Sequence, residues 1–131
     1  MPDAATTEVL NDVYEGFVAG DLERVGRRMT DDVVAIDPPE VVDGDTFEGR
    51  EAVLGRLAGF LELFDQIELI GLGLEDIGDR VLATFTARGR AHIGGAQADL
   101  AIVHLIRMRD GLVAELRVFF DEVAARQFAA A

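Results

Sequence analysis

The second half of the chain alternates apolar and polar residues over long stretches, and this pattern constrains the fold more than any other feature. It is typical of strands, whose side chains point to opposite faces in turn. The pattern predicts strands at residues 67–74, 81–88, 96–109 and 112–120. Between the last two lies Asp110-Gly111, a strong signal for a two-residue hairpin. Long strands joined mainly by hairpins predict a largely antiparallel sheet.

The first of these segments changes phase once. Ile67 and Leu69 occupy one face of the expected strand. Ile70, Leu72 and Leu74 then continue in the opposite phase, in the region that contains Gly71 and Gly73. A slip of one residue beside a glycine is typical of a β-bulge. We therefore expect a strongly bent strand, and a bent sheet leaves a hollow on its concave side where a ligand can bind.

Helical spacing dominates the earlier part of the chain, where Leu10, Tyr14, Phe17 and Val18 share one face. Asp21 is a suitable N-cap for a short second helix. Further elements are expected as a strand at 33–37, a loop at 38–49, a helix at 50–64 and a closing helix at 121–128. The sequence predicts one α+β domain spanning residues 1–131, with a strongly bent antiparallel or mixed sheet wrapped like a cone around N-terminal helices.

The composition excludes several classes of function. The chain has 131 residues, no cysteine and a net charge of −13, so it is an acidic protein. Thiolate chemistry is absent, and the negative charge disfavours nucleic acids and anionic membrane surfaces as partners. No signal peptide or membrane-spanning run is visible, which predicts a soluble, cytoplasmic location. His92 and the acidic turns near residues 43–45 and 75–79 lack metal-ligand spacing, so neither a metal nor another cofactor is expected.

One carboxylate stands at the end of an otherwise apolar strand. The run 33–36 is followed directly by Asp37 and then by Pro38 and Pro39, which stop the strand. Two interpretations are open. The side chain caps the following turn, or it faces an apolar pocket and moves a proton there.

Several segments together resemble the nuclear transport factor 2-like superfamily, in its SnoaL-like and ketosteroid-isomerase-like branches. The resemblance rests on residues 14–22, 31–38, 49–53, 109–111 and 117–121. It covers nearly the whole chain and implies a cone-shaped, cystatin-like α+β fold. Because that superfamily contains isomerases, cyclases, hydrolases, dehydratases and proteins without activity, it does not imply one reaction.

The resemblance also indicates which residues of this chain occupy the catalytic positions of the family. Asp37 falls where ketosteroid isomerases carry their general base. Their two oxyanion donors fall on Val13 and His104, so both are replaced. The ending at 117–121 is similar to that of limonene-epoxide hydrolases, which makes Asp121 an alternative acid, although a helix cap is the simpler interpretation.

His104 lies in a strand that is apolar on both faces. One face carries Leu100, Ile102, His104 and Ile106, and the other face carries Ala101, Val103 and Leu105. His104 is either a hydrogen-bonded core histidine or a donor to a ligand in the hollow. The second apolar row predicts that another copy of the chain covers the outer face, as a homodimer.

The residues expected to line a hydrophobic pocket are aromatic or aliphatic, and simple core packing is the alternative for all of them. They are Tyr14, Phe17, Phe60, Phe85, Ile102, Leu116, Val118 and Phe120. The function implied is a SnoaL-like, cofactor-independent enzyme of the isomerase, cyclase or dehydratase type, acting on a hydrophobic oxygenated small molecule with Asp37 and His104 as catalytic residues. The alternative is a domain without catalysis that binds an apolar ligand or serves only in dimeric interaction.

Overall fold

The computed structural model describes residues 2–41 and 45–131; the predicted acidic turn at 43–45 falls largely outside this part. The helices are α1 (Ala4–Val18), α2 (Leu22–Gly26), α3 (Arg50–Leu61) and α4 (Glu122–Ala130). The strands are β1 (Met29–Ile36), β2 (Thr46–Glu48), β3 (Phe64–Ile77), β4 (Arg80–Ala91), β5 (Gln97–Arg109) and β6 (Leu112–Phe119). Several bounds differ from expectation. β1 starts at Met29 and not at residue 33, the third helix stops before Phe64, which starts β3, and the expected loop contains β2.

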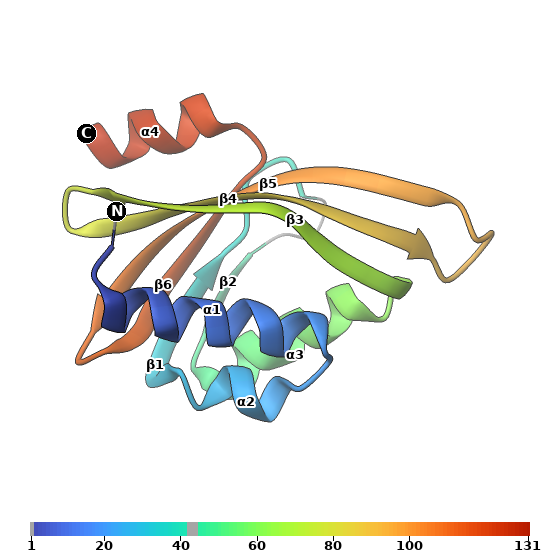
Figure 1. Ribbon diagram of the computed structural model, residues 1–131, viewed down its shortest axis with the longest axis horizontal. Helices are drawn as coiled ribbons and strands as arrows, with labels where there is room; N and C mark the ends of the chain where they lie inside the picture. The colour runs from blue at the N-terminus through green and yellow to red at the C-terminus, as the bar shows by residue number, and fades with distance from the viewer. Residues whose placement is uncertain (1, 42–44) are drawn as a thin grey trace.

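The six strands form one mixed sheet in the order β2-β1-β6-β5-β4-β3. β1 and β6 run parallel, while the remaining neighbours are antiparallel. Helices α1, α2 and α3 lie on the concave side of the sheet, and α4 lies on the other side (Figure 1). The predicted α+β cone is therefore confirmed, with the apolar core between the sheet and the first three helices.

The N-terminal helices begin where capping residues satisfy free backbone amides. The Asp3 carboxylate accepts a hydrogen bond from the backbone N–H of Thr6 at 2.8 Å. The predicted N-cap Asp21 does the same for Arg24 at 3.1 Å and starts α2. Each such cap contributes about 1 kcal/mol to helix stability. These caps help to position the face of α1 that carries Tyr14 against the sheet.

The expected bulge in β3 is present. Pairing with β4 shifts in register between Ile70 and Gly73, and Gly71 adopts a positive φ of 70°. Leu69 and Leu72 consequently both pack against the core, while Ile70 is exposed. The extra residue bends the strand and increases its twist, which turns the sheet around the helices. The Asp110-Gly111 hairpin is also confirmed, with φ values of 54° and 77°.

The outer face of the sheet is partly covered by the chain's own C-terminus. Val103 and Leu105 are buried there in a cluster with Leu82 of β4 and Ala125 of α4. Asp121 caps α4 by accepting a hydrogen bond from the N–H of Val123 at 2.9 Å, as predicted for a helix cap. Val103 and Leu105, which belong to the apolar row that suggested a second copy, are thus covered within one chain. The homodimer stays a prediction.

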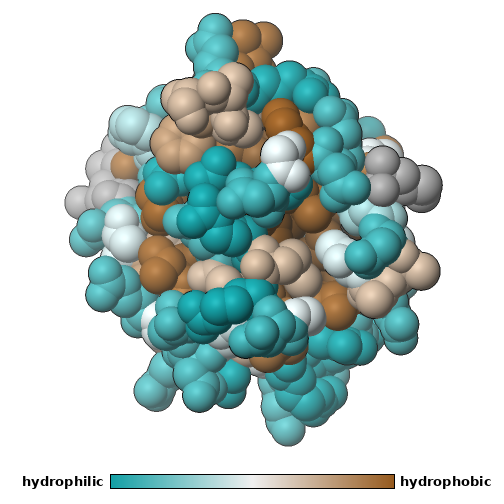
Figure 2. Space-filling view, turned by 90° about the vertical axis from the view of Figure 1, so that its left-hand side faces the viewer, coloured by the Kyte–Doolittle hydropathy of each residue, from teal (hydrophilic) through white to brown (hydrophobic). Residues whose placement is uncertain are grey.

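Hydrophilic and hydrophobic residues are mixed on the face shown in Figure 2. On the face shown in Figure 2, brown hydrophobic patches are scattered among teal hydrophilic residues and do not merge into one area. Within residues 2–41 and 45–131, no helix is both long enough and apolar enough to cross a membrane.

Gly89 should be intolerant of a side chain. A Cβ atom there would lie 2.4 Å from Cδ1 of the Phe64 ring, so the ring would have to move. We expect Gly89→Ala to lower the free energy of unfolding by about 1–3 kcal/mol, as other overpacked sites do. The matched control is Gly55→Ala in α3, where nothing lies within 4 Å of the new Cβ. It should be neutral or stabilising by up to about 1 kcal/mol. Urea unfolding measures both, and equal effects would contradict the packing argument.

Candidate active site

A cavity of about 100 Å³ lies between the concave face of the sheet and helix α3. Its walls are mostly apolar, with three polar side chains among them. The lining residues are Ala35, Asp37, Val41, Val53, Arg56, Leu57, Phe60, Phe85, Leu100, Ile102, His104, Leu116, Val118 and Phe120. Phe120 and Leu100 are the exposed members of this set, so they mark its open end.

A second cavity of about 50 Å³ adjoins the first on the side of α1. It is lined by Leu10, Val13, Tyr14, Phe17, Met29, Leu57, Phe85, His104, Ile106, Val113 and Leu116. Four of these residues line both cavities, His104 and Phe85 among them. His104 therefore stands at the boundary between the two spaces.

The structure brings the predicted site residues together. Asp37 and His104 both line the larger cavity. Of the eight residues expected to form an apolar pocket, six line the larger cavity and the other two, Tyr14 and Phe17, line the smaller one. The expected face of β5 with Leu100, Ile102 and His104 is the face that points inward. Placement alone does not assign roles, because the same side chains also form the core.

Asp37 follows β1 at the wall of the cavity, and its side chain is only 6% exposed. Its Oδ2 accepts a hydrogen bond from Nε of Arg56 at 2.9 Å. In the described part of the chain its carboxylate makes no hydrogen bond to a backbone amide, so the turn-cap interpretation finds no support there. The ion pair compensates the charge of a carboxylate that is otherwise largely removed from water.

His104 forms a pair with a tyrosine of α1. The Tyr14 hydroxyl lies 2.7 Å from Nδ1 of His104, and the two rings are nearly parallel, at an interplanar angle of 12°. Phe85 contacts both rings edge-on, with centroids 5.4 Å and 5.2 Å away. Aromatic packing of this kind restricts the orientation of the imidazole.

Burial determines the protonation of this pair. It lowers the pKa of His104 to about 4 and raises the pKa of the Tyr14 phenol. Both groups are therefore neutral near pH 7. The tautomer that satisfies the phenol has Tyr14 donating to Nδ1, which leaves the proton of the imidazole on Nε2. Nε2–H is then a neutral hydrogen-bond donor in a residue that lines both cavities.

The register of the sheet sets the spacing of the two polar groups. Ile36 pairs with Arg117, and His104 pairs with the next residue of β6, Val118. Asp37 thus lies level with His104 across one intervening strand. Adjacent strands are about 4.8 Å apart, so the Cα atoms are separated by about 10 Å. Both side chains line the same cavity.

Arg56 is the polar residue that sequence reasoning missed. It is 30% exposed and extends from α3, where Val53, Leu57 and Phe60 also line the cavity. The sequence did contain a signal for it, because Arg56 is a cation among the apolar residues of one face of the expected helix. The Tyr14–His104 bond was missed as well, although a buried imidazole in an apolar strand needs a partner.

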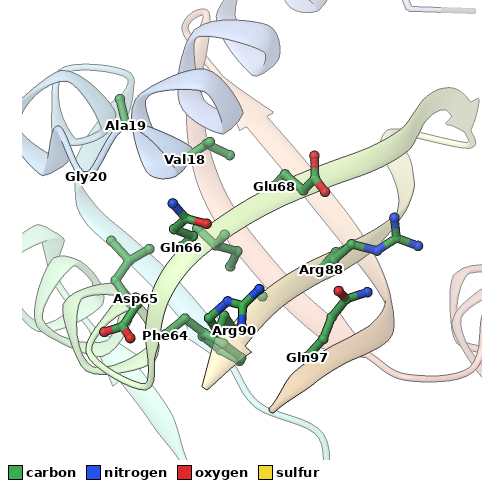
Figure 3. Close-up of a pocket in the computed structure, with 13 residues that line it drawn as sticks. Val18, Ala19, Gly20, Phe64, Asp65, Gln66, Glu68, Arg88, Arg90 and Gln97 are labelled. Atoms are coloured by element: carbon green, nitrogen blue, oxygen red, sulfur yellow. The ribbon is translucent and has the colours of Figure 1, made fainter. Parts of the chain in front are cut away.

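A larger surface groove of about 700 Å³ lies elsewhere, at the end of α1 and along β3 and β4. Figure 3 shows charged and amide side chains along it, among them Glu68, Arg88 and Gln97. Arg88 is paired with Asp99 at 2.9 Å, on the outer sheet face. None of the predicted site residues lines this groove, so size alone does not identify the site. No group of three or more potential metal-ligating side chains occurs in the described part of the chain.

A bent mixed sheet closed by three helices over an apolar cavity defines the cone-shaped class of nuclear transport factor 2-like proteins. The chain belongs to the SnoaL-like domain family, whose model matches residues 10–116. The family resemblance expected from the sequence is therefore confirmed. No curated protein matches the chain.

Solved structures agree with this assignment. TerC, crystallised with polyporic acid, has a TM-score of 0.79 at 26% identity and covers 98% of this chain and 100% of its own. A nuclear transport factor 2-like protein of unknown function from Burkholderia pseudomallei has a TM-score of 0.79 at 22% identity, with coverages of 98% and 100%. A hypothetical protein with a ketosteroid-isomerase-like fold from Catenulispora acidiphila, in complex with trimethylamine, has a TM-score of 0.74 at 16% identity, with coverages of 88% and 86%.

Proposed function

We propose that this SnoaL-like protein is a cofactor-independent enzyme that performs acid/base chemistry on a hydrophobic, oxygen-bearing small molecule. The observation that carries the proposal is the joint presence of Asp37 and His104 on the wall of one apolar cavity. The similarity to TerC, which was crystallised with polyporic acid, supports a small organic ligand of this kind. Isomerase, cyclase and dehydratase reactions all begin with a proton transfer that such a site can perform.

The reaction step assigned to the site is enolisation. The Asp37 carboxylate takes a proton from the carbon next to a carbonyl group. The electron pair of the broken C–H bond forms a carbon–carbon double bond, and the π electron pair of the carbonyl group moves to its oxygen. Nε2–H of His104 donates a hydrogen bond to that oxygen as its charge develops. Asp37 then returns the proton to the same or another carbon. Because His104 is neutral, it polarises the oxygen and does not act as an imidazolium acid.

The alternative is a binding domain without chemistry. A volume of about 100 Å³ favours it, since pockets for drug-sized ligands commonly span about 300–1,000 Å³. The other feature expected of that alternative is a carboxylate held by backbone amides. In the described part of the chain Asp37 instead pairs with a side chain, Arg56, so this second feature of the binding domain is not seen there.

The test is deuterium incorporation into single-ring ketones. Cyclohexanone and cyclohex-2-enone, which contain a single ring, are incubated with the protein in deuterated buffer and followed by proton NMR. We expect exchange next to the carbonyl at a rate above that of buffer and of heat-denatured protein. Binding of the ketones without faster exchange would contradict the enzyme proposal and favour the binding domain.

A further inference from the structure

Arg56 lies where its guanidinium can contact a ligand in addition to Asp37. It is the only cationic side chain among the residues that line the larger cavity, as far as the structure describes them. Its side chain is 30% exposed, compared with 6% for Asp37, so the guanidinium is more accessible to solvent than the carboxylate it pairs with. The exposed lining residues Leu100 and Phe120 belong to that same cavity.

Among the described residues, the hydrogen bonding of Arg56 leaves one edge of the guanidinium without a partner. Nε donates to Oδ2 of Asp37, and the plane of the group lies near the Phe47 ring, with Cζ 5.9 Å from the ring centroid. Between residues 2–41 and 45–131, neither Nη1 nor Nη2 has a hydrogen-bond partner. Two parallel N–H donors on one edge match the two oxygens of a carboxylate.

We propose that Arg56 binds the carboxylate of a small cyclic oxo-acid at the mouth of the cavity and so determines the substrate class. This inference rests on the proposed function in taking the cavity as the substrate site. The ring occupies the apolar interior, the carboxylate meets Nη1 and Nη2 of Arg56, and the ring carbonyl lies against Nε2–H of His104. Asp37, held at the Nε side of Arg56, then lies between the two oxygen-binding groups.

The net charge of the whole chain overstates the repulsion that an anionic ligand meets at the site. The chain carries a net charge of −13, yet exposed charges beyond about 8–10 Å are largely screened at physiological ionic strength. The nearest charge to a carboxylate on Nη1 and Nη2 is Arg56 itself, while Asp37 lies on the other side of the guanidinium. Because the Coulomb interaction falls with distance, attraction to the nearer cation exceeds repulsion by the farther anion.

The experiment compares 4-oxocyclohexane-1-carboxylate with its neutral carboxamide by isothermal titration calorimetry. The two probes share the ring and the ketone, and they differ in the group that meets Arg56. We expect wild-type protein to bind the acid about tenfold more tightly, equivalent to about 1.4 kcal/mol. Arg56→Gln should remove this preference and leave the affinity for the carboxamide within about twofold. Arg56→Lys keeps a charge beside Asp37 but lacks the planar fork, so it should keep only part of the preference.

Arg88→Gln is the matched control, because Arg88 forms an ion pair of the same length, 2.9 Å, outside the cavity. It should keep the full preference for the acid. Equal affinity for both probes in the wild type, or binding of neither, overturns the proposal. A loss of affinity for both probes in Arg56→Gln also overturns it, since that result assigns Arg56 a purely structural role; unfolding curves of Arg56→Lys show whether charge alone maintains the fold. Binding is measured without turnover, so failure here is distinct from failure of the deuterium-exchange test.

Discussion

Asp37→Asn is expected to reduce enzyme-dependent deuterium exchange by about 10²–10⁴-fold, the usual contribution of a positioned general base. Asparagine keeps the shape of the side chain and an oxygen that accepts from Nε of Arg56, but it takes up no proton at neutral pH. Ligand affinity and the unfolding midpoint should therefore change little. Proton NMR of the ketone measures the exchange, and thermal unfolding monitors the fold.

Asp121→Asn is the control for this substitution. Asp121 is the other carboxylate that the sequence suggested as a catalyst, but it caps α4 through the N–H of Val123. Asparagine is an equally good N-cap, so stability and exchange should both stay close to wild type. If Asp37→Asn retained full exchange, or if Asp121→Asn lost it, the assignment of Asp37 as the base would be wrong.

Acid is expected to destabilise the protein through His104. Its pKa is about 4 in the folded state because of burial, compared with about 6.5 in the unfolded chain. The unfolded state therefore takes up a proton as the pH falls below about 6.5, whereas the folded state does so only near pH 4. The contribution of neutral His104 to stability is complete above about pH 6.5. It declines by about 3 kcal/mol as the pH falls to 4.

Urea unfolding of the wild type and of His104→Leu across pH 4–7 measures this effect. The variant should be less stable at pH 7, because the Tyr14 hydroxyl loses its partner, but its stability should fall less steeply with acid. His92→Gln is the control: Asp65 raises the pKa of the exposed His92 through a hydrogen bond, so His92 acts in the opposite direction. Carboxylates with lowered pKa values, such as Asp12 and Asp99, lose their contribution mainly below this range. Parallel pH profiles for wild type and His104→Leu would refute the prediction.

Much of the fold was predictable because its signals are local. The phase change beside Gly71, the Asp110-Gly111 hairpin and the caps Asp21 and Asp121 all appear in the structure as expected. Each depends on backbone geometry or on hydrogen bonds within a few residues. β2 was missed because its three residues become a strand only by pairing with the edge of β1.

The candidate site was predictable in its members but not in its contacts. Alternation along β5 placed His104 on the inward face, and helical spacing placed Tyr14 and Phe17 on one side of α1. The bond between Tyr14 and His104 spans 90 residues of sequence, and no local pattern encodes it. The same is true of the outer apolar row, part of which α4 covers although a second copy had been expected to do so.

The sequence by itself determined the family, the bent sheet and the apolar strand that ends in Asp37, since periodicity, turn residues and motif spacing are properties of neighbouring residues. Only the tertiary structure decided which side chains lie near that carboxylate. Arg56 pairs with it at 2.9 Å, and a neutral His104, hydrogen-bonded to Tyr14, lines the same cavity. The reason is physical. Charge compensation, desolvation and the choice of a histidine tautomer depend on which distant side chains the fold brings into contact. The curled sheet and the helices packed on its concave side create those contacts.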